Sequence, residues 1–184
     1  MKRVFDLIVA VVLLGLLSPL FALIAWLVYR HDKGPFLYRQ QRVGLNGRHF
    51  GLLKFRSMVL NADKIGSYAT QDADPRITAV GRFIRRTSLD ELPQLINILR
   101  GDMSFVGPRP DVPQQRDLYT EEEWTKRHSV RPGLTGLAQA TLRSSATPEQ
   151  RKRLDLQYVD HCGLVFDLKI VLRTIIQVST KGGN

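Results

Sequence analysis

The feature that most limits how this chain can fold is an apolar run near its N-terminus. Between Asp6 and Arg30 lie 23 residues without a charged side chain, LIVAVVLLGLLSPLFALIAWLVY. A helix needs roughly 20 apolar residues to cross a bilayer, so the run is long enough to enter a membrane. It is longer than the apolar part of a signal peptide, and Trp26 and Tyr29 stand near its end, where small residues would mark a cleavage site. A helix that is apolar around its whole circumference is also unusual in a small soluble domain. We therefore predict that this segment enters a membrane.

Two topologies remain open for the run. Basic residues favour the cytoplasmic side, and they flank both ends: Lys2 and Arg3 before it, then Arg30, His31, Lys33, Arg39 and Arg42 after it. Pro19 lies in the middle, lacks an N–H and clashes with the preceding turn, so we expect a kink or break there. The Ser18 hydroxyl can bond a carbonyl that the break frees. One interpretation is a re-entrant helix-break-helix anchor, and the other is a kinked single span.

Length and composition indicate one compact domain beside the anchor. The 184 residues allow a division into an anchor at residues 1–30 and a catalytic domain at residues 31–184. The formal net charge of +10 suits nucleic acid, anionic headgroups or phosphorylated substrates without choosing among them. The single cysteine, Cys162, excludes an internal disulfide and fits a reducing, cytosolic side. The four histidines show no metal-ligand spacing, which argues against zinc chemistry.

Hydrophobic periodicity indicates an α+β fold that is mainly helical. Alternating residues over 36–55, with a turn at Gly44–Gly47, predict a small β-hairpin. Residues 60–79 are polar and are expected to form a loop or a short helix plus loop, whereas residues 103–116 and 131–136 are rich in turn residues. We expect amphipathic, interfacial helices around a compact core, at residues 80–86, 89–99, 121–127, 148–161 and 164–180. The last of these either packs in the core or lies on the membrane surface.

Two adjacent carboxylates, Asp90 and Glu91, stand just before one of the predicted helices. A purely structural interpretation is a capping box formed by Ser88 and Glu91. Pro93 argues against it, because a helix capped by Ser88 would have proline in its interior. A start nearer Asp90 or Leu92 puts Pro93 in the first turn, where no donor is needed, and puts Asp90 at the helix end that stabilises phosphate. Acidic residues at helix starts are common, so this segment alone does not decide between the two interpretations.

Basic residues occur in the segments before and after the carboxylates. Lys54 and Arg56 leave the hairpin, and Arg85 precedes Asp90 and Glu91. Arg109 lies between two prolines, and Arg131 comes before a Pro-Gly turn. Arginine donors match phosphate oxygens in two-point geometry. Taken singly, each cation is better explained by a solvent or headgroup contact. Together, Lys54, Arg56, Arg85, Arg109 and Arg131 are the candidate phosphate ligands, and the rigid turns favour Arg109 and Arg131.

Taken together, these segments resemble the bacterial sugar transferase family, the monotopic phosphoglycosyl transferases. The likeness covers nearly the whole chain, including the Ser18-Pro19 break. The matching pieces are Lys54–Met58, Asp74–Thr78 with Gly81, Ser88–Gln94, Gly101–Pro110, Arg131–Gly136, and finally Asp155, Tyr158 and Asp167–Ile170. The chain is similar to the minimal form of the family, because larger relatives carry extra membrane helices and a further domain before this core.

The resemblance implies a re-entrant anchor, with the catalytic domain on the cytoplasmic face of the bacterial inner membrane. It implies that Asp90 attacks the β-phosphate of a UDP-sugar, releases uridine monophosphate (UMP) and carries the phosphosugar until polyprenyl (undecaprenyl) phosphate accepts it. Mg²⁺ is the implied metal, held by Asp90 and Glu91, and Glu91 is alternatively a base. Lys54 and Arg109 are the implied phosphate ligands, with Arg131 as a further one. A carboxylate nucleophile divides one hard displacement into two, and a metal and arginines neutralise the charge that is transferred.

One segment departs from the family pattern. After Gly136 many relatives read Ala-Gln-Val-Asn-Gly-Arg, whereas residues 138–143 here read Ala-Gln-Ala-Thr-Leu-Arg. The sugar specificity of the relatives is therefore not transferred to this chain on the basis of this loop. The competing function is a non-catalytic, membrane-tethered binder of anionic lipid or nucleic acid. Nucleic-acid readers usually add aromatic stacking faces or a recognition helix, which the sequence lacks, so no nucleic-acid partner is expected. The sequence indicates neither the sugar nor the oligomeric state.

Overall fold

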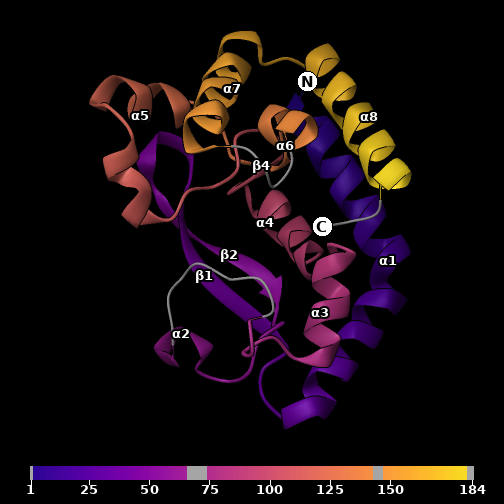
Figure 1. The fold of residues 1–184 in the computed structure, drawn as a ribbon. Helices are drawn as coiled ribbons and strands as arrows, with labels where there is room; N and C mark the ends of the chain where they lie inside the picture. The colour runs from indigo at the N-terminus through magenta and orange to yellow at the C-terminus, as the bar shows by residue number, and fades with distance from the viewer. Residues whose placement is uncertain (1, 66–73, 143–146, 182–184) are drawn as a thin grey trace.

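The apolar run forms a single helix, α1 (Lys2–Asp32), along one side of the molecule (Figure 1). The computed structural model describes residues 2–65, 74–142 and 147–181. The helix does not end at Pro19, so the predicted break is absent from its hydrogen-bonded course. The Ser18 hydroxyl donates to the Gly15 carbonyl at 2.8 Å. Because Pro19 has no N–H to reach that carbonyl, the predicted repair by Ser18 is confirmed.

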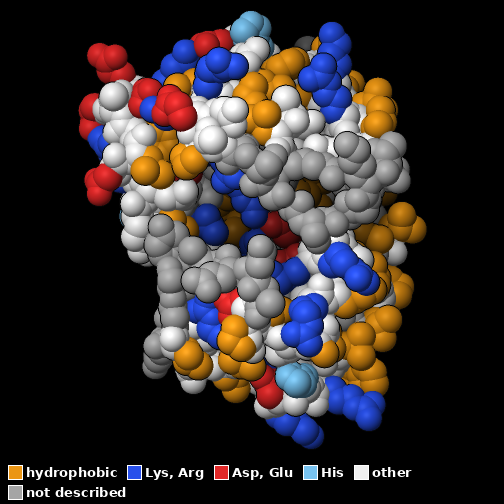
Figure 2. Space-filling model, viewed as in Figure 1, with side chains coloured by type: hydrophobic (Ala, Val, Ile, Leu, Met, Phe, Trp, Pro, Cys, Tyr) orange, Lys and Arg blue, Asp and Glu red, His pale blue; other side chains and the backbone are white. Residues whose placement is uncertain are grey.

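One side of α1 packs on the protein, and the other is apolar and exposed. Within the described residues it is the one helix long and apolar enough to cross a membrane. Ala10 packs in a core with Leu52, Ile98 and Met103, and farther along Ile24 belongs to a second core cluster. The exposed side carries Val4, Ile8, Val11, Val12, Leu16, Leu23, Trp26 and Tyr29. Figure 2 shows apolar side chains along the edge of the molecule where α1 and α8 lie in Figure 1.

Both ends of α1 are tied to the same globular body. At the N-terminal end Lys2 pairs with Asp167, and the buried Asp6 carboxylate accepts hydrogen bonds from the Ser104 hydroxyl and the Phe105 amide. At the C-terminal end the Asp32 carboxylate accepts two hydrogen bonds from the Arg56 guanidinium. Because buried polar groups need partners, these contacts fix the helix against the body at both of its ends.

The predicted hairpin is confirmed as β1 (Leu37–Val43) and β2 (His49–Phe55). The strands are antiparallel, with Leu37 opposite Phe55 and Val43 opposite His49. The turn η1 (Leu45–Gly47) contains Asn46 at φ 53°, a left-handed conformation that asparagine tolerates.

The predicted helices are also present, and several short elements add to them. The further helices are α2 (Ala62–Ile65), α3 (Ala79–Arg86), α4 (Gln94–Arg100), α5 (Glu121–Arg127), α6 (Leu137–Leu142), α7 (Pro148–His161) and α8 (Leu164–Lys181), with 3₁₀ turns η2 (Leu89–Glu91) and η3 (Pro113–Leu118). Helix α8 buries Ile170 beside Tyr158 and Val106 but exposes Val165, Leu168, Leu172, Ile175 and Ile176. It therefore both packs in the core and presents an apolar face. Arg143 lies outside the described residues.

The turn-rich segments are more regular than the sequence predicted. Strand β3 (Ser104–Val106) pairs in parallel with β4 (Gly133–Thr135). Glycines allow this close approach: a Cβ on Gly107 would lie 2.3 Å from the Arg131 carbonyl oxygen, and one on Gly133 would lie 2.1 Å from the Gly107 nitrogen. The pairing joins the Gly107–Pro110 turn to the Arg131–Gly136 turn.

Candidate active site

The two carboxylates lie on a tight turn between α3 and α4. Ser88 is left-handed, with φ 56°, and its side chain makes no capping hydrogen bond, so the capping-box interpretation is wrong. The 3₁₀ turn η2 follows, and Pro93 stands directly before α4. Pro93 thus occupies the position where its missing N–H costs nothing, as predicted. Strained backbone of the kind found at Ser88 is concentrated at functional sites.

Asp90 and Glu91 are adjacent but lie in different surroundings. The Glu91 Oε1 atom accepts hydrogen bonds from Lys54 Nζ at 2.8 Å and from Arg109 Nη2 at 3.2 Å. Asp90 is only 8% exposed, and within the described part of the chain no hydrogen bond reaches its carboxylate. One carboxylate is therefore held by two cations, whereas the other is buried and receives no hydrogen bond from the residues that the structure describes.

This difference separates the acidities of the two groups. Burial raises the pKa of Asp90 and Glu91 adds to the rise, while Lys54 and Arg85 pull it down without cancelling it. Burial would also raise the pKa of Glu91, but Arg109 and Lys54 outweigh that effect and hold it at about 2. Glu91 is a fixed anion at neutral pH. The Asp90 carboxylate, being more basic and not hydrogen-bonded, is the better nucleophile of the two.

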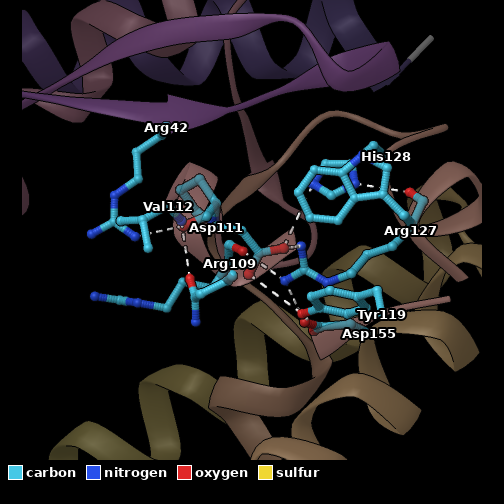
Figure 3. A network of polar contacts seen from close by, with 11 residues as sticks. Arg42, Arg109, Asp111, Val112, Tyr119, Arg127, His128 and Asp155 are labelled. Carbon is cyan, nitrogen blue, oxygen red and sulfur yellow. Dashed lines mark hydrogen bonds and ion pairs between the residues drawn. The ribbon is translucent and has the colours of Figure 1, made fainter. Parts of the chain in front are cut away.

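A buried network holds the Arg109 turn in place (Figure 3). Arg127 is 2% exposed and forms ion pairs with Asp111 and Asp155. Its Nη2 also donates to the Arg109 carbonyl at 2.8 Å. The Tyr119 hydroxyl donates to Asp111 at 3.4 Å. The network fixes the backbone from which Arg109 reaches Glu91.

Sequence reasoning missed Arg127 and Asp111. Arg127 ends a predicted helix whose other polar residues are on the surface, so nothing local distinguishes it from them. Asp111 directly follows the Pro-Arg-Pro turn, and that position was the available signal. Asp155 entered only through the family resemblance.

The structure brings four of the seven predicted catalytic and phosphate-binding residues together. Asp90, Glu91, Lys54 and Arg109 meet as described, and Arg85, in the last turn of α3, acts electrostatically on Asp90. Figure 2 shows a hollow in this face of the molecule, with Lys and Arg side chains around acidic atoms on its floor.

Two of the predicted phosphate ligands have other partners. Arg56 bonds Asp32 and donates Nε to the Pro35 carbonyl at 2.7 Å. Arg131 donates Nε to the Gly101 carbonyl at 2.9 Å, at the end of α4 that is remote from Asp90. Both contacts brace the fold, and among the described residues neither arginine has a contact with the carboxylate pair. A phosphate-binding role for them stays a prediction.

The donor set fits Mg²⁺ better than a metal held by protein alone. Among the described residues no group of three or more His, Cys, Asp or Glu side chains could hold a metal ion. Mg²⁺ is commonly bound by one or two carboxylates together with substrate phosphates and water. Asp90 and the Oε2 atom of Glu91, to which no described residue donates, provide such a set.

Comparison with known proteins relates the whole described fold to one family. The family model for bacterial sugar transferases matches residues 1–181. The chain is 43% identical over 185 residues to a UDP-glucose:undecaprenyl-phosphate glucose-1-phosphate transferase of Escherichia coli K12, covering 96% of this chain and 40% of that protein. A Caulobacter vibrioides protein of the same description is 44% identical over 97% of this chain and 70% of its own length. An undecaprenyl-phosphate galactose phosphotransferase of Salmonella typhimurium is 39% identical over 100% of this chain and 41% of its own length. The chain thus spans less than half the length of two of these relatives.

Proposed function

The chain belongs to the bacterial sugar transferase family, and we propose that it moves a sugar 1-phosphate from a UDP-sugar to polyprenyl phosphate at a membrane. The names of the three relatives support this proposal, because each describes a transferase or phosphotransferase that acts on undecaprenyl phosphate. Two are named for glucose and one for galactose, so the sugar is left open.

The observation that carries the proposal is the contrast between Asp90 and Glu91. Hydrogen bonds and ion pairs lower the nucleophilicity of a carboxylate, and Asp90 is buried with no hydrogen bond from the described residues. Glu91 is held by Lys54 and Arg109. We assign attack to Asp90 and the placement of the two cations to Glu91.

In the first step a carboxylate oxygen of Asp90 attacks the β-phosphorus of the donor. A new O–P bond forms, the bond from the β-phosphorus to the bridging oxygen breaks, and UMP leaves with that electron pair. Lys54 and Arg109 offset the charge that develops on the phosphoryl oxygens. The product is a phosphosugar-aspartate.

In the second step a phosphate oxygen of the polyprenyl phosphate attacks the same phosphorus. The bond to Asp90 breaks, the free carboxylate returns, and polyprenyl-diphosphate-sugar is released. Splitting one displacement into two lets each substrate bind in turn beside the same two cations.

We further propose that Asp90 and Glu91 hold Mg²⁺ together with the donor phosphates. The ion would supply charge neutralisation on the transferring group.

For α1 we propose a re-entrant anchor with both ends on the cytoplasmic side of the inner membrane. A span needs roughly 20 residues surrounded by lipid. Contacts of α1 with the body recur at Lys2, Ala10, Ile24 and Asp32, which leaves no such stretch between them. Protease-cleavable tags at Met1 and Asn184 test the topology, and ends on opposite sides of the membrane would refute it.

Donors labelled at one phosphate or the other test the covalent step. The protein is incubated with a panel of UDP-sugars and Mg²⁺, without lipid acceptor. A β-phosphate label should stay on Asp90, while an α-phosphate label should leave as UMP. Asp90→Asn should abolish both signals. The matched control is Asp117→Asn, an exposed carboxylate on η3. A wild-type protein that turns over without ever carrying the β-label would disprove the covalent route.

The same assay separates the transferase from a non-catalytic, membrane-tethered binder of anionic lipid or nucleic acid. Such a binder would release no UMP from any donor in the panel, with or without polyprenyl phosphate.

A further inference from the structure

The hairpin presents a second arginine to the active site. Tyr38 lies opposite Lys54 in the strand pairing, so the two side chains share a face of the hairpin. Because side chains alternate along a strand, Gln40 and Arg42 lie on that same face. Arg39 is exposed and lies on the opposite face. The face that supplies Lys54 to Glu91 therefore also supplies Arg42.

Among the described residues, the Arg42 guanidinium is held by neutral acceptors. Its Nε and Nη2 atoms donate to Gln40 Oε1 at 3.1 Å and 2.6 Å, and its Nη1 donates to the Pro110 carbonyl at 2.8 Å. The adjacent Val43 amide donates to the Asp111 carbonyl at 2.9 Å. In residues 2–65, 74–142 and 147–181 no carboxylate forms an ion pair with Arg42. The side chain is thus oriented without its charge being neutralised by a direct partner.

Arg42 lies beside Arg109, the arginine that reaches Glu91. Figure 3 shows both on one side of the buried network, and Pro110, which accepts from Arg42, is the neighbour of Arg109. Burial and the charge of Arg109 lower the pKa of Arg42 to about 10, so it remains a cation at neutral pH. Two half-shielded guanidinium groups held together repel each other, and a bound anion would relieve that repulsion.

A run of contacts leads from Glu91 through the Arg109 turn to Arg42. Glu91, next to Asp90, bonds Arg109, and the turn that carries Arg109 is bonded by Arg42. A diphosphate whose β-phosphorus lies at Asp90 and whose chain extends past Arg109 would reach Arg42. We infer that Arg42 is a donor-binding residue that contacts the phosphate leaving as UMP, and that Gln40 positions it for that contact. The inference rests on the proposed function, because it takes a UDP-sugar as the donor.

The test measures the affinity of the full chain, in mild detergent, for radiolabelled UDP by equilibrium dialysis. Arg42→Gln should raise the dissociation constant on the order of 10- to 100-fold, the usual cost of losing a hydrogen bond to a charged group. Arg39→Gln removes the same charge from the other face of the same strand and should leave the constant within about twofold, since the contribution of an exposed charge is small.

A second variant separates phosphate binding from simple bracing of the Pro110 turn. Gln40→Glu places a carboxylate where Arg42 now finds a neutral oxygen, so it strengthens the bracing while neutralising the cation. It should weaken UDP binding by about tenfold without lowering the melting temperature. It also keeps the inference testable if Arg42→Gln fails to fold.

The outcomes separate the inference from the proposed function. A wild-type protein that releases UMP, with UDP affinity unchanged in either Arg42→Gln or Gln40→Glu, overturns the role of Arg42 alone. A wild-type protein that neither binds UDP nor releases UMP overturns both.

Discussion

Replacing Arg127 by methionine removes the one cation that two buried carboxylates share. Asp111 and Asp155 both pair with Arg127, and each is at most 5% exposed. Methionine has a similar apolar length but no charge, so the variant leaves both buried carboxylates without the guanidinium, and Asp111 keeps the hydrogen bond from the Tyr119 hydroxyl. It also removes the donor that holds the Arg109 carbonyl.

The expected loss follows from this geometry. Breaking a buried ion pair by removing one partner costs about 3–5 kcal/mol, because the remaining charge is uncompensated. Lys126→Met is the matched control, since Lys126 is the preceding residue and pairs with Asp160 on the surface. Exposed pairs contribute about 0.2–1 kcal/mol, so the control should lose little.

The loss should depend on pH with a definite sign. In the wild-type protein burial, with the nearby Asp155, already raises the pKa of Asp111 to about 6 against the pull of Arg127. Removing Arg127 raises it further. A carboxyl group whose pKa is raised by folding favours the folded state below its unfolded pKa and loses that contribution as pH rises through the folded value. The deficit of the variant should therefore be largest at pH 8 and shrink towards pH 5.

Urea unfolding in mild detergent, followed by tryptophan fluorescence, measures the loss. Trp124 lies next to His128, with ring centroids 4.1 Å apart, and so reports on this region. Adding Asp111→Asn and Asp155→Asn to Arg127→Met should recover most of the stability, because neutral amides replace the stranded charges. A deficit below about 1 kcal/mol in the single variant at pH 8 would show that the network is not the buried charge cluster described here.

Four further changes probe the site, the strand contact and the anchor. Asp90→Asn should abolish turnover and raise the free energy of unfolding at neutral pH by about 0.5–2 kcal/mol. In thermal melting this gain should fade at acid pH, because the raised pKa of Asp90 lets the wild-type carboxyl protonate there. Glu91→Gln should flatten the acid limb of the stability curve, since a pKa lowered from 4.5 to about 2 contributes stability above pH 4.5 that is lost as pH falls towards 2. Gly133→Ala should lower the free energy of unfolding, measured in urea, by about 1–3 kcal/mol or more, because its Cβ would lie 2.1 Å from the Gly107 nitrogen. The control Gly15→Ala should leave it unchanged, because a Cβ there meets nothing within 4 Å. Leu16 is 72% exposed on α1, so Leu16→Glu should reduce partition onto lipid vesicles at least tenfold in a flotation assay. An unchanged partition would show that this face of α1 is not the lipid-binding surface.

Local patterns were sufficient for most of the elements. Neighbouring residues suffice to show the alternation over β1 and β2 and the helical pattern in α4 and α7. Strand β3 could not be predicted in this way, because its partner β4 lies far along the chain and three residues show no usable period. The glycines that permit the pairing resemble ordinary turn residues until both turns are seen together.

The site residues were likewise predictable only where the signal is local in the sequence. Adjacent carboxylates and arginines in rigid turns pointed to Asp90, Glu91 and Arg109 before any contact was known. For Arg131 the structure shows a contact with the Gly101 carbonyl, which the sequence did not predict, and its phosphate-binding role stays a prediction. Sequence reasoning could not identify Arg127, because burial of a charged residue depends on distant partners, here Arg109 and Asp111 on one turn and Asp155 on α7.

The attachment of α1 at both of its ends has a practical consequence for anyone preparing the protein. A chain shortened to begin after Asp32 would not yield a water-soluble catalytic domain. It would strip Ala10 and Ile24 from two hydrophobic clusters and leave Asp167 and Arg56 without their salt-bridge partners. Helix α1 is thus a structural part of the domain that carries the candidate site, and extraction with the helix retained is the route that preserves it.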